Sequence, residues 1–138
     1  MAIIAAAVVG CATPEAAGLE AFATITVSVD DRLLSVALAD TRALTRQGLR
    51  GVTDLGSLDG MLFDLGESRA VRFTMRDTLI PLDIHFFDEA GRLVGEFEMT
   101  PCESEPCPTY SPDRAVRYAL ETPAGSLDGE VGVLTLGG

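Results

Sequence analysis

The segment Val71–Val94, VRFTMRDTLIPLDIHFFDEAGRLV, contains the alternation that decides the fold class. Apolar and polar side chains alternate on both sides of Pro81, and a period of two is typical of half-buried β-strands. Because proline has no N–H to donate to a β-ladder, we expect Pro81 at a strand boundary. The residues DEAGR predict a turn into a further apolar run, so the segment predicts a series of short strands.

The same alternation extends through most of the chain from Phe22 onward. Two runs, FATITVSV and LLSVALA, are separated by acidic residues and predict a hairpin. Only DTRALTRQGL has the features of a helix, with Asp40 or Thr41 as its N-cap and Gly48 at its end. Roughly eight short strands favour a mainly β fold, a compact antiparallel β-sandwich or jelly-roll-like barrel with one short helix.

Length and charge restrict the possible partners. A chain of 138 residues suits one domain with its own core, and 21 acidic against 10 basic residues give a net charge of −11. Nucleic-acid binding depends on clustered Lys and Arg, and no dense basic run is present, so we expect no nucleic-acid partner. The same charge opposes contact with an anionic lipid surface. We also expect a monomer.

The first eleven residues, MAIIAAAVVGC, resemble the lipobox of a bacterial lipoprotein, in which the peptidase cleaves before a cysteine that carries a lipid. We therefore expect a signal remnant at 1–10, lipid on Cys11, a tether at 11–20 and a single β-rich domain at 21–138. A span takes about 20 apolar residues, so the membrane would be contacted only through the lipid. This predicts a protein of the periplasm or cell envelope. No basic residue precedes Arg32, so we expect the true start upstream; the alternative is an apolar N-terminal strand.

The two remaining cysteines, Cys102 and Cys107, lie in TPCESEPCPTY, each beside a proline. In an oxidising compartment this spacing can close a small disulfide loop. The alternative is half of a zinc site. Zinc would need two further ligands, and the chain has a single histidine, so the composition favours the disulfide.

The sequence nominates no catalytic residue, metal site or cofactor: it has no Gly-rich phosphate loop, no His-Glu-x-x-His and no Gly-x-Ser-x-Gly. Asp83 and His85 are two apart on a predicted strand and therefore share a face. A carboxylate beside an imidazole suits a general base, a metal ligand or a ligand anchor. Arg76 and Asp77 precede the turn at Pro81 and could fold toward them. The alternative is a solvated outer face with ion pairs of little energetic value.

Ordered motifs then point to a family. RQGLRG follows the expected helix, DGMLF ends at Phe63, TMRDTLIPLDIHFF includes Pro81, and RYALETPAG ends at Gly125. From about Phe22 to Gly125 this order resembles the bacterial and archaeal family called domain of unknown function 192. The resemblance implies a compact, mainly β and often exported domain, and it carries no established activity. Glu121 keeps its motif identity, so we add it to the candidate site.

The sequence departs from the family motifs at four positions. Thr74 stands where the family has tryptophan, Arg76 where it has lysine, Asp77 where it has asparagine, and Arg50 where methionine is usual. A ligand that stacks on that tryptophan in other members would find a different surface here.

Three functions remain possible from sequence alone. We expect first a small binding module of the cell envelope for a small-molecule or carbohydrate-like ligand. Its tentative ligand-binding residues are Arg76, Asp77, Asp83, His85 and Glu121. The alternatives are a protein-interaction module without a small-molecule site, and a hydrolase or metal-dependent enzyme centred on His85 and Asp83. Asp83 could also be architectural, accepting hydrogen bonds from turn N–H groups.

Overall fold

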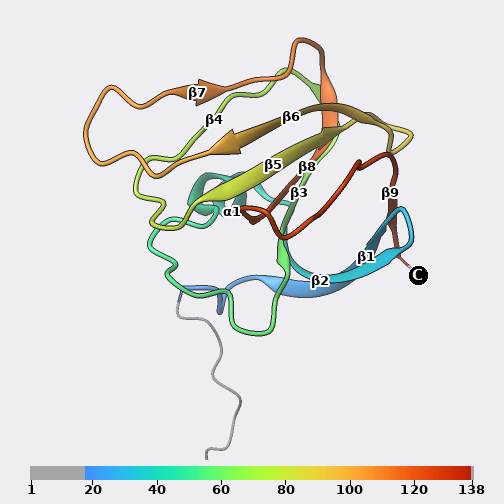
Figure 1. The fold of residues 1–138 in the computed structure, drawn as a ribbon, viewed down its shortest axis with the longest axis horizontal. Helices are drawn as coiled ribbons and strands as arrows, with labels where there is room; N and C mark the ends of the chain where they lie inside the picture. The colour runs from blue at the N-terminus through green and yellow to red at the C-terminus, as the bar shows by residue number, and fades with distance from the viewer. Residues whose placement is uncertain (1–17, 138) are drawn as a thin grey trace, which may run out of the picture.

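Within residues 18–137, the protein is built from one strongly curled β-sheet, a small second sheet and one short helix (Figure 1). The computed structural model describes residues 18–137, so the predicted lipid site at Cys11 lies outside the described residues. Its elements are β1 (Ala23–Val29), β2 (Arg32–Ala39), α1 (Arg42–Gln47), β3 (Gly60–Arg69), β4 (Phe73–Thr74), β5 (Leu82–Phe87), β6 (Leu93–Met99), β7 (Thr109–Tyr110), β8 (Val116–Pro123) and β9 (Leu134–Leu136).

The main sheet has the strand order β6-β5-β8-β3-β2-β1-β9, and β4 pairs with β7 in the second sheet. The mainly β fold with one short helix is confirmed, and the main sheet curls into a half-barrel. The sheet differs from the expected antiparallel pattern at one pair among the described strands. β2 and β3 run parallel because α1 and the loop after it carry the chain back before β3 begins.

Local signals place the hairpin and the helix as predicted. Asp30 takes a positive φ of 54° in the β1–β2 turn, a conformation that Asp tolerates better than most residues. The Thr41 side chain accepts a hydrogen bond from the N–H of Leu44 at 3.1 Å, which caps α1. Gly48 ends the helix with a φ of 48°. Pro81 directly precedes β5, at a strand boundary.

The main sheet buries apolar side chains on both faces. One face carries α1 and the loop after it, and its buried side chains form the helix-side core: Ala37, Ala39, Leu49, Val52, Leu55, Met61, Phe63, Met75, Leu82, Ile84, Phe86, Met99 and Ala119. The segment between β8 and β9 covers the other face. That face holds the C-terminal core: Val27, Val29, Leu34, Val36, Leu62, Phe87, Leu120, Leu127, Val131 and Leu134.

The C-terminal segment also brings the two edges of the main sheet together. β9 pairs with β1, and just before it Gly132 accepts a hydrogen bond from the N–H of Leu93 at 2.9 Å. Leu134 donates its N–H to the carbonyl of Gly91 at 2.8 Å. A Cβ at Gly91 would collide with the carbonyl oxygen of Leu134, so glycine is required for this close approach. The contacts link the β5–β6 turn to the β1–β9 edge (Figure 1).

The small sheet packs on the main sheet through aromatic rings. Phe73 of β4 contacts Phe63 and Phe86 edge-on, with ring centroids 5.0 and 5.6 Å away. Phe97 lies 5.9 Å from Tyr110 of β7, so the ring contacts continue across both sheets.

A disulfide joins Cys102 to Cys107 in the loop between β6 and β7, with the two Cα atoms 5.7 Å apart. This is the pairing that the sequence favoured. Arg76 lies beside this loop and forms an ion pair with Glu105 at 3.1 Å. Within residues 18–137, no helix is long and apolar enough to cross a bilayer.

Candidate functional site

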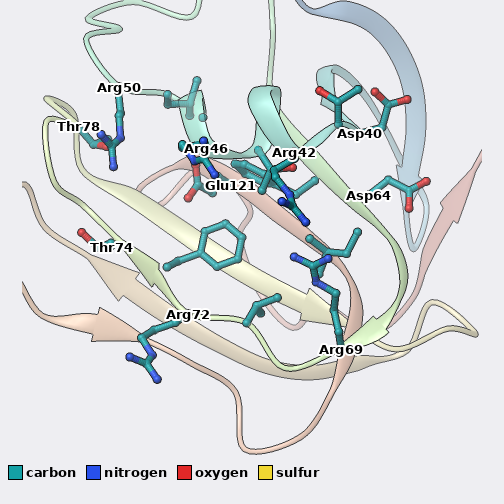
Figure 2. Close-up of a pocket in the computed structure, with 18 of the residues that line it drawn as sticks. Asp40, Arg42, Arg46, Arg50, Asp64, Arg69, Arg72, Thr74, Thr78 and Glu121 are labelled. Carbon is teal, nitrogen blue, oxygen red and sulfur yellow. The ribbon is translucent and has the colours of Figure 1, made fainter.

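A pocket of about 460 Å³ lies between α1 and the segment that joins β3 to β4 (Figure 2). Its volume is within the range of about 300–1,000 Å³ that is common for small-molecule sites. One wall is α1 with its flanking residues, and the opposite wall is the end of β3, the following segment and β4. β8 contributes Glu121.

Arginines dominate the polar lining of this pocket. Five of the chain's ten basic residues line it, whereas the protein as a whole has a net charge of −11. They are Arg42, Arg46, Arg50, Arg69 and Arg72. Figure 2 shows Arg42, Arg46 and Arg69 around the pocket, while the guanidinium of Arg72 is directed away from them. The pocket is therefore a local concentration of positive charge on an acidic protein.

The buried carboxyl group of Glu121 is the most unusual feature of the pocket. Glu121 is only 5% exposed and has no hydrogen bond or ion pair with any described residue. In the sheet it lies between Met61 of β3 and Ile84 of β5, both fully buried. Burial raises the pKa of Glu121 to about 8, so most of this carboxyl group is protonated at neutral pH.

Backbone packing holds Glu121 at this position. Gly60 begins β3 opposite β8, and a Cβ at Gly60 would collide with the carbonyl oxygen of Glu121. Glycine therefore allows β3 and β8 to approach closely beneath the pocket. Apolar contact surface in the lining comes from Phe63 and Phe73, and hydroxyl groups come from Thr74 and Thr78.

This lining can bind a small polar molecule by several kinds of contact. Guanidinium groups donate paired hydrogen bonds to carboxylate or phosphate oxygens. A protonated carboxyl group donates one hydrogen bond and still accepts others. Phe73 offers an aromatic surface to the apolar part of a ligand. The arrangement has the features of a binding site: a concave apolar surface with a few convergent polar groups.

The structure does not bring the five sequence-predicted site residues together. Glu121 lines the pocket, whereas the other four lie outside its lining. Arg76 is paired with Glu105 on the disulfide loop. Asp77 takes a positive φ of 57° in its turn and lies 3.7 Å from Arg50. Arg50 and Asp77, two of the departures from the family motifs, thus form an ion pair at one end of the pocket.

Asp83 and His85 share a face, as expected, but it is the face opposite Glu121. Glu121 pairs with Ile84 across β5 and β8, whereas His85 pairs with Leu120 of the C-terminal core. Asp83 accepts a hydrogen bond from the N–H of Gly125 at 2.9 Å. The sequence suggested such an architectural role for Asp83, as an acceptor of hydrogen bonds from turn N–H groups. The donor in the structure lies in the turn after β8.

His85 is buried on β5, next to the edge strand β6. Its Nε2 lies 3.2 Å from Glu96 on β6, and its Nδ1 is buried without a hydrogen-bond partner among the described residues. Burial lowers the pKa of His85, and the carboxylates of Glu96 and Asp83 offset part of that lowering. No group of three or more His, Cys, Asp or Glu side chains within residues 18–137 is placed to hold a metal ion.

Sequence reasoning missed the arginines of the pocket. Arg42 and Arg46 are four apart on α1, so they share one face of this helix. That spacing was visible in DTRALTRQGL and marked a basic helix face in an acidic chain. The contribution of Arg69 could not be found in this way, because only the fold brings the end of β3 opposite α1.

The fold and the pocket define a small, mainly β protein with an arginine-lined cavity beside its only described helix. The chain belongs to the domain of unknown function 192 family, described as uncharacterized ACR, whose model matches residues 24–132. This confirms the family resemblance that the ordered motifs indicated. The comparison with curated proteins finds no match.

Two solved structures are similar to this chain. One is a crystal structure of a candidate transcription regulator from Sinorhizobium meliloti 1021, with 29% identity and a TM-score of 0.73, over 83% of this chain and 95% of that one. The other is a protein of unknown function from Novosphingobium aromaticivorans DSM 12444. It has 25% identity and a TM-score of 0.69, over 90% of this chain and 93% of that one.

Proposed function

We propose that the protein is a small-molecule binding module of the cell envelope, with its ligand in the pocket between α1 and the β3–β4 segment. The observation that carries this proposal is Glu121, a buried carboxyl group that lines the pocket and has no described protein partner. Burying a polar group without a partner reduces stability. A ligand that hydrogen-bonds to Glu121 would remove this penalty.

The envelope location rests on the first residues and on the disulfide. MAIIAAAVVGC has the form of a lipobox, and the disulfide between Cys102 and Cys107 is the type of bond that persists in oxidising compartments. We therefore propose a lipid on Cys11 and a domain that faces the periplasm or the outer surface. A ligand would then reach the pocket from the extracytoplasmic solution.

The name of the Sinorhizobium structure suggests a role in transcription for that protein. We do not extend that role to this chain. Its net charge of −11 opposes the phosphate backbone of nucleic acids, and five of its ten arginines line a concave pocket that is too small to hold a duplex. These features favour a small ligand over a nucleic acid.

Blocking the pocket tests the proposal. Thr45 lies on α1 in the lining, so Thr45→Trp should fill the pocket, whereas Ala43 is exposed on the same helix outside the lining, and Ala43→Trp is the matched control. The melting temperature of each protein would be measured with glucose, glucuronate, citrate and glucose 6-phosphate. At a concentration of ten times Kd a ligand stabilises the folded state by about 1.4 kcal/mol, which raises Tm by about 4 °C.

We expect at least one of these compounds to raise the Tm of the wild type and of Ala43→Trp, but not that of Thr45→Trp. Equal shifts in all three proteins would place binding elsewhere. No shift with any compound would contradict the proposed function.

A further inference from the structure

We infer that the ligand of this pocket is a small polyanion with at least two carboxylate or phosphate groups, held between the arginines of the two walls and hydrogen-bonded to Glu121. This inference rests on the proposed function, because it names the class of ligand that the same pocket would take. The inference depends on the positions of the pocket arginines and of Glu121 in the fold.

The first observation is that four of the five pocket arginines have no described protein partners. Arg42, Arg46, Arg69 and Arg72 take part in none of the ion pairs or side-chain hydrogen bonds of residues 18–137. By contrast, Arg117 near the end of β3 is paired with Asp64 at 2.9 Å. The pocket therefore offers guanidinium groups whose hydrogen-bond donors are available to a ligand.

The second observation is that the arginines stand on both sides of the pocket. Arg42 and Arg46 lie on α1, and Arg69 lies at the end of β3 on the opposite wall (Figure 2). Like charges four residues apart destabilise a short helix, so the Arg42–Arg46 pair is unfavourable for α1 by itself. An anion between the walls would relieve that repulsion and make paired hydrogen bonds to each side. If each wall binds one anionic group, the ligand must carry at least two.

The third observation is the unpartnered Glu121 beneath the arginines. The charged groups around the pocket are the two arginines of α1, Arg50 after α1, Arg69 at the end of β3, Arg72 in the segment before β4, and the carboxylates Asp40 and Asp64. Asp64 is already bound by Arg117, and Arg50 by Asp77. β5 and β3 present only the apolar Ile84 and Met61 beside Glu121. These neighbours leave the carboxyl group free to donate its proton to a ligand oxygen.

The acid form of Glu121 links binding to pH. Because burial raises the pKa of Glu121 to about 8, the group is mostly a neutral donor at pH 7.0 and mostly a carboxylate at pH 9.5. A carboxylate there would repel an anionic ligand and could no longer donate. The protonated fraction falls about 30-fold between these two pH values, so affinity should fall by a similar factor.

Isothermal titration calorimetry on the oxidised protein tests this inference, with citrate (three carboxylates) and fructose 1,6-bisphosphate (two phosphates) as anionic probes and glucose as the neutral probe. We expect one of the two anions to bind, and its affinity should fall as NaCl is raised. Which of the two binds distinguishes a carboxylate ligand from a phosphate ligand. Glucose should bind at least tenfold more weakly than that anion. Arg46→Gln and Arg69→Gln should each weaken binding about tenfold. Arg114→Gln is the matched control, because Arg114 is exposed and lies outside the lining.

Glu121→Gln separates the neutral donor from a purely structural role. Glutamine keeps an N–H donor but cannot ionise, so this variant should bind the anion at pH 7.0 and lose the affinity change between pH 7.0 and pH 9.5. A preference for glucose, blocked by Thr45→Trp, would overturn the polyanion inference and leave the proposed function standing. Binding of an anion that is unaffected by the pocket arginine variants would also overturn it. No binding of any probe would overturn both.

Discussion

Glu121→Gln should remove the steady loss of stability that Glu121 causes in the wild type between about pH 4.5 and pH 8. In the folded protein burial raises the pKa of Glu121 from 4.5 to about 8. The folded state therefore holds this proton more tightly than the unfolded chain does. Stability from this group is fully present below the unfolded pKa and is lost as pH rises through the folded pKa.

The magnitude follows from the size of the shift. At about 1.4 kcal/mol for each pKa unit, the free energy of unfolding of the wild type should fall by up to about 5 kcal/mol between pH 4.5 and pH 8. About 3 kcal/mol of this should already be lost at pH 7. Above pH 8 the contribution of Glu121 should become constant. Glutamine has nearly the same shape and no charge, so the variant should lack this slope.

Urea unfolding at pH 5, 7 and 9 measures the effect, with the disulfide kept intact. The matched control is Glu98→Gln, because Glu98 is exposed on β6 and should leave the pH slope unchanged. We expect Glu121→Gln to be several kcal/mol more stable than the wild type at pH 9 and similar to it at pH 5. Identical pH slopes in the wild type and Glu121→Gln would refute the reasoning, because Glu121 would then ionise freely in the folded state.

Two further predictions concern the turn after β8 and the attachment to the membrane. Asp83→Ala removes the acceptor of the Gly125 N–H and should lower the free energy of unfolding by about 1 kcal/mol, as measured in urea. If the variant were as stable as the wild type, the architectural role of Asp83 would be contradicted. Full-length protein made in a bacterial host should partition into detergent, and Cys11→Ser should move it to the aqueous fraction; equal partition of the two would contradict the lipid anchor.

Alternation along the chain was sufficient to predict most of the strands. In β1 and β2, every second side chain enters the C-terminal core or packs against it, as the period of two requires. Alternation does not predict which face a side chain takes where the strand pairing is irregular. A register shift between Phe86 and Phe87 places Leu93 opposite Phe87, where it packs against the C-terminal core, whereas Phe97 stays in regular register with Ile84 on the helix-side face. A bulge of this kind leaves no signal in the alternation itself.

The candidate site was less predictable, because it depends on contacts between distant segments. Asp83 and His85 were expected on a polar face, but the segment between β8 and β9 covers that face and buries His85. Glu121 was nominated through its motif, and only the pairing of β8 with β3 and β5 explains its burial. The curl of the sheet places the end of β3 opposite α1 across the pocket. The alternation of apolar and polar residues does not predict this curl.

The contact between the first hairpin and the C-terminal segment also sets the order of folding. Asp30 accepts hydrogen bonds from the N–H groups of Gly132 and Val133, which lie 102 and 103 residues later in the chain. The β1–β2 hairpin is local and can form as soon as it is synthesised, but its outer edge has no partner strand until β9 emerges. Until β9 has been synthesised, the backbone of β1 therefore presents an open edge that other chains could pair with. The two edges of the main sheet can therefore be joined only after β9 has been synthesised.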